Sequence, residues 1–599
     1  MLNKFQFFLF FYLLVTAHPF KILATPRVPI VYTVSFPSPE THEIQVKMVL
    51  TGVHQSQLLL KMPVWAPGSY LIREFSKNVE TLKAEHEDQN LQVHKVAKNE
   101  WAVYTPHMHT VIITYTVYAF ERSVQSSFAD ISHAFLSNPG IFIYPSGMLS
   151  APSIVHILPY KNWTTVSTSL DPIKGASNTF FAPNYNILFD SPFEIGNQDL
   201  VNFKVENTNY QLAIYGSGNY NKQRMVKDLT RVIEKQVEIF GENPNRNYLF
   251  ILHNFQNLTG DGLEHSKSSV VELSRNMFTD STLYHVFLNV MAHEHFHLWN
   301  GKRLRPIALG PFNYDRENYT GDLWIVEGFT RYYENATVNR TKLFSVNDYL
   351  HELSQNISFV VNQSGLPYES LADASFDAWI KLYRHNENSA NSTINYYNQG
   401  ALIAMQLDLE IIHDSHGAYR LDDAMRYMYD RYEKKLHRGY TDAEFRAGLE
   451  KFTNKSLATF YKKYITGTVA IDIDHYLNFA GYKLVDENAG TNNTWVGTYT
   501  EPINGNLRIN ELVRNSSFYQ AGLNVNDIIT AIDNSPVADL SAAVKNKKPG
   551  DEIGVTALRD GLPMTFKVKL LRRPYVQYHI ESEADLTTEQ IATRKKWLE

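Results

Sequence analysis

The chain contains no cysteine, which excludes disulfide bridges, cysteine-ligated zinc, iron–sulfur clusters and thiol nucleophiles. Any bound metal must therefore be held by histidine and carboxylate side chains. A long basic run is also missing and the formal net charge is −6, which argues against nucleic-acid binding as a main function. Hydrophobic residues make up 44% of the 599 residues, so we expect several buried cores rather than a disordered chain.

Apolar runs are short everywhere, and the longest occupies residues 5–17. This run follows Lys4 and is too short for a hydrocarbon layer of ~30 Å, but it has the length of a signal-peptide core. We expect residues 1–24 to be a signal peptide that exports the chain; a short retained anchor is the alternative. An exported chain without cysteine fits a bacterial periplasm better than a disulfide-rich exterior, although secretion is also possible. We expect no membrane span after signal removal.

The hydrophobic period changes along the chain. Residues 25–205 alternate apolar and polar side chains, as at Ile44, Val46 and Met48, which predicts a β-sandwich-like domain. Residues 206–480 contain the strand-like stretch 248–252 and four helical patterns, at 281–299, 325–336, 399–414 and 421–434. The alternation returns in residues 481–573, and a helical-looking tail, 574–599, closes the chain. The predicted fold class is multidomain α+β.

The motif that carries chemistry is His293-Glu294-His295-Phe296-His297. Residues four apart share one face of a helix, so His293 and His297 can bind one metal ion through neutral imidazoles. Glu294 is placed to accept a proton from water. His295 is off the metal-binding face. The alternative is a histidine-rich helix without metal.

A third protein ligand is needed at such a site. The extended metzincin pattern requires Gly at 300 and His at 303, but those positions hold Asn300 and Arg303, so that class is rejected. A carboxylate on a later helix is expected instead. The candidates are Asp315, Glu317, Asp322, Glu327 and Glu334. Glu327 lies among apolar residues, where a metal would compensate a buried charge.

Several blocks resemble one known family in the right order. The segment Trp324-Ile325-Val326-Glu327-Gly328-Phe329 looks like the block that carries the third zinc ligand in gluzincin aminopeptidases. The segments 298–306, 62–70 and 262–265 are similar to the glycyl aminopeptidase family, and the resemblance runs from about residue 29 to the end. It implies a thermolysin-like, mainly helical catalytic domain with one Zn²⁺ per chain, held by His293, His297 and Glu327.

The same resemblance implies further roles. Gly262 and Glu264 would form an edge strand that binds the substrate backbone and pairs with its free α-amino group. The residue before Gly262 is Asp261, where the family would have glycine. Matching on Gly400 makes Tyr397 the residue that stabilises the oxyanion. Arg303 and Arg305 are left out of the predicted site.

Residues 516–523, 527–533 and 548–555 resemble a PDZ domain of bacterial protease type. Such domains bind extended peptide or protein ends by strand addition, and a purely structural module is the alternative. The predicted function is zinc-dependent peptide hydrolysis by Glu294, most simply an aminopeptidase that releases glycine or alanine. A zinc endopeptidase and a catalytically vestigial peptide-binding scaffold are the alternatives.

Overall fold

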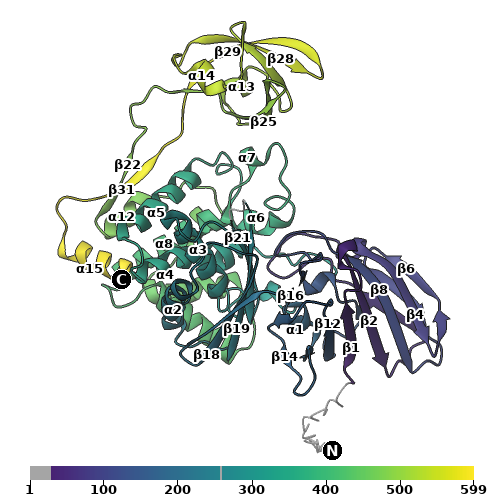
Figure 1. The fold of residues 1–599 in the computed structure, drawn as a ribbon. Coiled ribbons are helices and arrows are strands. Elements are labelled where there is room, and N and C mark those ends of the chain that lie inside the picture. The colour runs from purple at the N-terminus through teal and green to yellow at the C-terminus, as the bar shows by residue number, and fades with distance from the viewer. Residues whose placement is uncertain (1–27, 257–259) are drawn as a thin grey trace, which may run out of the picture.

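The computed structural model describes residues 28–256 and 260–599, so the predicted signal peptide lies outside the described residues. Figure 1 shows three units in chain order: one rich in strands, one mainly helical, and a small β-rich unit set apart from both. This arrangement confirms the predicted multidomain α+β class. Over the described ranges, every helix falls short of the length or apolar character needed to cross a bilayer.

The N-terminal unit is built around a large sheet. Its strands lie in the order β14 (Asp171–Pro172), β15 (Thr179–Ala182), β12 (Ser153–Leu158), β1 (Ile30–Ser35), β2 (Glu43–Thr51), β8 (Thr110–Tyr118), β4 (Val79–His86) and β5 (Gln89–Leu91). Alternate side chains of β2 are buried, which explains the alternation in its sequence. One face of each strand therefore supplies the core.

Two four-stranded sheets share this core. One contains β13 (Thr165–Thr168), β16 (Phe193–Gly196), β10 (Ala134–Leu136) and β9 (Phe128–Ala129). The other contains β11 (Tyr144–Pro145), β3 (Gln57–Lys61), β7 (Glu100–Tyr104) and β6 (Val93–Ala97). The sheets enclose large buried aromatic side chains such as Tyr32 and Trp101. This is the β-rich, sandwich-like domain that the sequence predicts.

A separate five-stranded sheet begins the middle unit. Its order is β17 (Asp199–Val205), β18 (Thr208–Tyr215), β19 (Asn247–Phe255), β21 (Ser268–Ser274) and β20 (Asp261–Glu264), with β20 at one edge. Strand β17 pairs with β18 along its whole length, although the sequence groups residues 199–205 with the N-terminal domain. The structure moves that boundary to before Asp199. Alternation alone marks a strand but not the sheet that it joins.

Helices surround this sheet and form one large core with it. The main ones are α2 (Lys222–Phe240), α3 (Ser281–Phe296), α4 (Thr330–Arg340), α5 (Val346–Val361), α8 (Tyr396–Asp414), α9 (Leu421–Met428), α10 (Asp442–Thr453) and α12 (Ile473–Phe479). Helix α2 begins at Asn221, which caps the Arg224 N–H, and ends at Gly241 with φ +80°. Helix α8 is buried nearly all round, as befits a central helix.

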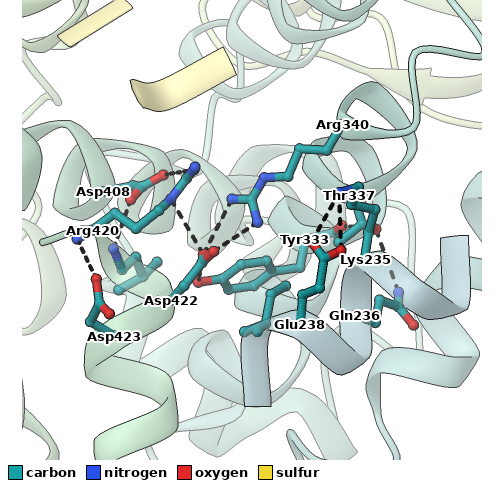
Figure 2. Close-up of polar contacts among 12 residues, drawn as sticks. Lys235, Gln236, Glu238, Tyr333, Thr337, Arg340, Asp408, Arg420, Asp422 and Asp423 are labelled. Atoms are coloured by element: carbon teal, nitrogen blue, oxygen red, sulfur yellow. Dashed lines mark hydrogen bonds and ion pairs between the residues drawn. The ribbon is translucent and has the colours of Figure 1, made fainter. Parts of the chain in front are cut away.

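A buried charge network connects three of these helices (Figure 2). Arg340 of α4 donates to both oxygens of Asp422 on α9, at 2.8 and 3.2 Å. Arg420 donates to Asp408 of α8 at 2.8 Å and to the backbone oxygens of Lys596 and Trp597. These oxygens belong to the C-terminal helix α15 (Thr588–Leu598). The predicted tail is thus a part of the core of the middle unit.

The C-terminal unit is a sheet of β24 (Thr498–Ile503), β25 (Asn506–Leu512), β26 (Ile528–Ile532), β28 (Glu552–Arg559) and β29 (Leu562–Lys569), with β27 (Ser535–Pro536) beside β26. Two short helices, α13 (Ser517–Gln520) and α14 (Leu540–Val544), complete its small core. The chain enters through β22 (Tyr482–Asp486) and returns through β31 (Tyr578–Ser582), which pair with each other outside this sheet. Both connections therefore run back to the middle unit.

Candidate metal centre and active site

Helix α3 presents two imidazoles side by side. The helix begins at Asp280, whose side chain accepts a hydrogen bond from the Leu283 N–H at 2.9 Å. His293 and His297 lie one turn apart at its C-terminal end, and their Nε2 atoms are 3.1 Å apart. Both nitrogens face the same point in space, which is the arrangement expected from their spacing of four.

Glu327 completes this group. Its Oε2 is 3.2 Å from Nε2 of His297 and 3.7 Å from Nε2 of His293. The three ligand atoms all lie within 4.8 Å of one another, and the Glu327 side chain is almost fully buried. Of the five carboxylates that the sequence offered as third ligand, Glu327 is therefore the one that the fold brings to both imidazoles.

A π-helical turn positions Glu327. The predicted helix 325–336 is η5, a π-helical stretch (Trp324–Phe329), followed directly by α4. A Cβ added to Gly328 would lie 2.5 Å from Cα of Gly400, and one added to Gly400 would lie 2.6 Å from the Trp324 oxygen. The backbones of η5 and α8 thus cross where only glycine fits. This crossing explains why a glycine follows Glu327 and another follows Tyr397 by three residues.

Hydrogen bonds hold the two imidazoles in place. Glu334 Oε2 is 2.6 Å from Nδ1 of His293, and the Asn300 oxygen is 2.9 Å from Nδ1 of His297. These partners direct both Nε2 atoms to the same point, as partners of metal-binding histidines do. The Asn300 side chain also donates to the backbone oxygens of Ile325 and Val326. Asn300, which stands where the metzincin pattern requires glycine, therefore connects the end of α3 to the segment that contains Glu327.

The donor set fits zinc. Two imidazole nitrogens and one carboxylate oxygen form the ligand set of catalytic zinc sites in this class of fold. The two Nε2 atoms are 3.1 Å apart, so they can share one proton in a hydrogen bond or bind one cation through their lone pairs. Burial lowers the pKa of His293, but the Glu327 and Glu334 carboxylates outweigh it and raise that pKa to about 9. The site attracts positive charge.

A second group of possible ligands lies at the domain boundary. Glu194 of β16 contacts His133 Nδ1 through one oxygen at 2.8 Å and His253 Nε2 through the other at 2.9 Å. Each imidazole has its own carboxylate oxygen here, so two hydrogen bonds account for the geometry. His293, His297 and Glu327 have no such pairing. The group on α3 is therefore the stronger candidate for a metal centre, and hydrogen bonds account for the Glu194 cluster.

Glu294 lies against the edge strand β20 and lines the same cavity as the two imidazoles. A Cβ added to Gly262 would lie 2.1 Å from Glu294 Oε1, so the carboxylate rests directly on the strand. Glu294 Oε2 is buried and has no hydrogen-bond partner among the described residues. Burial raises the pKa of Glu294 well above its usual range; His297 opposes this shift and Glu264 adds to it.

Glu264 ends strand β20 and is buried against the N-terminal unit. A Cβ added to Gly68, which has φ +96°, would lie 2.6 Å from Glu264 Oε2. The loop that contains Gly68 and Ser69 therefore closes one side of the site. Asp261 does not disturb the strand, because its side chain accepts a hydrogen bond from the Gly262 N–H at 2.9 Å and its register with Glu272 is regular.

Tyr397 lies in the first turn of α8. The side chain of Asn395 caps this turn by accepting from the Tyr397 N–H at 2.9 Å. The Tyr397 hydroxyl shares a hydrogen bond of 2.7 Å with the hydroxyl of Tyr383, and its ring lies 6.4 Å from that of His293. Tyr383 was not predicted, since a tertiary contact of this kind leaves no local signal among 36 tyrosines.

One cavity of about 380 Å³ unites the site. Its lining includes all seven residues predicted from the sequence: Gly262, Glu264, His293, Glu294, His297, Glu327 and Tyr397. It also includes residues outside that predicted set: Gly68, Ser69, Gln125, Arg331, Tyr383 and Glu334, the last of which was a candidate third ligand. Gly68 and Ser69 lie within the segment 62–70, whose role depends on the contact between the N-terminal and middle units.

Residues excluded from the predicted site have structural partners. His295 is buried between Gln236, at 2.6 Å, and the Tyr210 hydroxyl, at 3.1 Å. Arg303 donates to the backbone oxygen of Leu298 at 2.6 Å, and Arg305 donates to that of Lys302 at 3.3 Å. These contacts fix the loop after α3 rather than face the cavity.

Comparison with solved structures supports the fold. The crystal structure of an aminopeptidase N family protein from Idiomarina loihiensis covers 95% of this chain and 100% of its own, with TM-score 0.88 and 28% identity. An M1 zinc metallopeptidase from Deinococcus radiodurans covers 75% of this chain and 95% of its own, with TM-score 0.47 and 13% identity. A search of curated proteins gave no match.

Three parts of the chain match known domain families. Residues 31–197 match the Peptidase M61 N-terminal domain, residues 286–403 the M61 glycyl aminopeptidase, and residues 494–570 the PDZ domain. The matches fall on the three units of the fold, and they confirm the family that the sequence motifs resemble. The chain therefore contains, in order, regions that match the M61 N-terminal domain, the M61 glycyl aminopeptidase and a PDZ domain.

Proposed function

We propose that this chain is a zinc-dependent aminopeptidase that releases small N-terminal residues, glycine first and alanine second. The observation that carries the proposal is the single cavity lined by a two-histidine, one-carboxylate donor set, a buried unpaired carboxylate and an edge strand. Each of these parts has a separate chemical task in peptide hydrolysis.

His293, His297 and Glu327 would hold one zinc ion per chain. When bound, zinc supplies Lewis acidity, which polarises the scissile carbonyl and makes water a better nucleophile at neutral pH. The contacts of Glu334 and Asn300 with the two Nδ1 atoms keep both Nε2 atoms free to bind it.

Glu294 is the proposed general base and acid. Its free Oε2 is available to take a proton from water and return it to the leaving amine. The close approach to Gly262 places this carboxylate beside a backbone that can hold an extended peptide. Proton transfer would therefore take place next to the bound substrate.

Glu264 and Tyr397 are proposed to bind the α-ammonium group and the carbonyl oxygen of the substrate, respectively. The buried carboxylate of Glu264 would accept hydrogen bonds from the α-ammonium group of the substrate. The Tyr397 hydroxyl would donate to the oxyanion that forms at the carbonyl. The hydrogen bond with Tyr383 orients that hydroxyl.

The preference for small residues rests on space near Glu264 and on the name of the matched family. The Gly68–Ser69 loop approaches the Glu264 carboxylate closely, which leaves little room beside the bound amine. Export to the periplasm, and binding of a peptide end by the PDZ domain, remain proposals that rest on residues 1–24 and on the PDZ match.

The test compares a glycyl peptide with its N-acetylated twin while bound zinc is quantified in the same sample. We expect cleavage of the free-amine peptide only, and loss of activity on chelation and in Glu294→Gln. Glu264→Gln should lower kcat/KM for the free-amine peptide by about 2 orders of magnitude, since it removes a charged hydrogen bond.

Other outcomes would change the proposal. Equal cleavage of both peptides would favour an endopeptidase, because Glu264 would then make no contact that requires a free α-amino group. Stoichiometric zinc with neither peptide cleaved would favour the scaffold interpretation.

A further inference from the structure

A second hollow lies where the PDZ unit meets the catalytic unit. It has a volume of about 720 Å³, and we call it the junction groove. The residues that matter for the argument are Phe359 and His385 from the catalytic unit and Tyr499, Glu511, Arg573 and Tyr575 from the PDZ unit and its return segment. Nothing in the predicted function uses these side chains.

The junction groove adjoins the active-site cavity. Leu382 and Asn395 line both spaces, so one begins where the other ends. Leu382 directly precedes Tyr383, and Asn395 caps the turn that carries Tyr397. The contact between the two spaces is therefore on the Tyr397 side of the metal ligands, whereas Glu264, at the end of β20, lies against Gly68. A peptide whose amine is at Glu264 would have its downstream residues directed toward the groove.

Hydrogen bonds between the PDZ unit and the catalytic unit fix the positions of the two walls of the groove. The buried side chain of Asn391, on α7 (Ser389–Ser392), donates to the Leu512 oxygen at 2.8 Å and accepts from the Arg514 N–H at 2.6 Å. This amide clamps the PDZ backbone to the catalytic unit. Figure 1 shows α7 beside the PDZ unit.

The return segment is docked on α5 in the same manner. Ser354, Ser358 and Asn362 are spaced by four on one face of the helix end, and each accepts from a backbone N–H. The N–H groups belong to Ile580, Tyr578 and Val576, at 3.1, 2.9 and 3.1 Å. Polar side chains bonded to backbone fix both sides of the groove, so it is a built feature of the fold.

The chemistry of the walls suits a polypeptide. Phe359 is 50% exposed and Tyr499 is 66% exposed, although both line a hollow. Unpaired aromatic faces of this kind bind apolar side chains, and the guanidinium of Arg573 and the imidazole of His385 add polar contacts for a peptide backbone or carboxylate. A dipeptide held at Glu264 would not fill both spaces, but a longer chain could.

We propose that the junction groove binds the downstream part of the peptide substrate, so that the enzyme acts on oligopeptides with a free N-terminus rather than on dipeptides. This inference rests on the proposed aminopeptidase function. Binding energy from residues remote from the scissile bond would then raise kcat/KM for long substrates.

The test measures kcat/KM for a glycyl dipeptide and for a decapeptide with the same first two residues. Wild type should prefer the decapeptide, and Tyr499→Ala and Phe359→Ala should each lower its kcat/KM roughly tenfold, the effect of losing one aromatic contact. Neither variant should change dipeptide hydrolysis. Tyr519→Ala is the control, because Tyr519 is 46% exposed on the PDZ unit but does not line the groove.

Three results would overturn the inference. If wild type cleaves both peptides equally well, the groove contributes nothing, although the aminopeptidase function would stand. If the decapeptide preference persists in both groove variants, the downstream residues bind elsewhere. Failure to cleave either peptide would overturn the aminopeptidase proposal, and the groove proposal with it.

Discussion

At the scale of single residues, the fold gives both histidine ligands of the candidate metal centre a hydrogen-bond partner. Glu334 contacts His293 and the Asn300 oxygen contacts His297, so the outer nitrogens of both rings are occupied. The sequence predicts that the two inner nitrogens lie on one helical face, because the histidines are four residues apart. It cannot predict Glu334, which reaches His293 only after α4 packs against α3, or the turn after α3 that brings the Asn300 oxygen to His297.

Replacing Glu334 with Gln should weaken zinc binding without abolishing it. The loss of a carboxylate partner of a ligating histidine typically costs ~10–100-fold in metal affinity, whereas Glu327→Gln removes a ligand and should cost more. Competition with a chelator of known affinity measures both values.

Asp315→Asn is the matched control for this series. Asp315 was a candidate ligand in the sequence, but its carboxylate contacts Lys61 of the N-terminal unit at 2.7 Å. Its zinc affinity should equal that of wild type. Weakened zinc binding in Asp315→Asn, or unchanged binding in Glu327→Gln, would contradict the assignment of ligands.

At the scale of elements, the crossing of η5 and α8 sets the distance between Glu327 and Tyr397. The predicted helical ranges match α3 and α8 closely, since their apolar residues are continuous and their caps are local. The π-helical stretch η5 was not predicted from the sequence, because a wider turn leaves no change in apolar period over six residues. The contact between Gly328 and Gly400 could not be predicted from the sequence, because it forms only where η5 and α8 pack together.

Gly400→Ala should destabilise the protein by ~1–3 kcal/mol, because the new methyl group would meet the Trp324 oxygen at 2.6 Å and force the helices apart. It should also lower activity by moving Tyr397 away from Glu327. Thermal unfolding and hydrolysis of a glycyl peptide measure the two effects.

Gly321→Ala serves as the comparison for that substitution. The nearest atom to its added Cβ is 3.7 Å away, an ordinary contact, so its stability should change by less than ~0.5 kcal/mol. Equal melting temperatures for the two variants would show that the crossing of η5 and α8 tolerates a side chain.

At the scale of the whole molecule, the N-terminal and catalytic units meet through buried charge. Glu194 of the first unit bridges His133 and His253, and the Nδ1 atom of His253 faces Glu272 at 3.6 Å. The three-unit order could be predicted from changes in hydrophobic period and from motifs. This contact could not, because His133, Glu194 and His253 are far apart in the sequence and each resembles an ordinary strand residue.

The pH dependence of stability follows from the pKa values of this cluster. Burial lowers the pKa of His253, but Glu194 outweighs it and raises the value from 6.5 to about 9. The contribution of His253 is thus complete below pH 6.5 and is lost as pH rises through 9. Burial raises the pKa of Glu194, but His133 outweighs it and lowers the value from 4.5, so its contribution is lost as pH falls below 4.5.

Glu194→Gln should therefore destabilise the protein by roughly 3 kcal/mol near pH 6, because it leaves the buried His133 without a charged partner and His253 with only Glu272, at 3.6 Å. The difference in melting temperature from wild type should shrink between pH 6.5 and 9. A parallel series in Asp315→Asn, whose ion pair is more exposed, should show no such trend. A difference that is constant over this range would contradict the assignment.

The loop at Gly68 has a consequence for the independence of the domains. Because this loop closes the side of the cavity at Glu264, the wall that we propose to bind the substrate amine is shared between the N-terminal and middle units. A catalytic domain expressed alone could keep its zinc ligands and yet lose its ability to recognise an N-terminus. The N-terminal unit therefore cannot be exchanged for another β domain as an independent module, because the exchange would remove the Gly68 loop and with it one wall of the proposed substrate site.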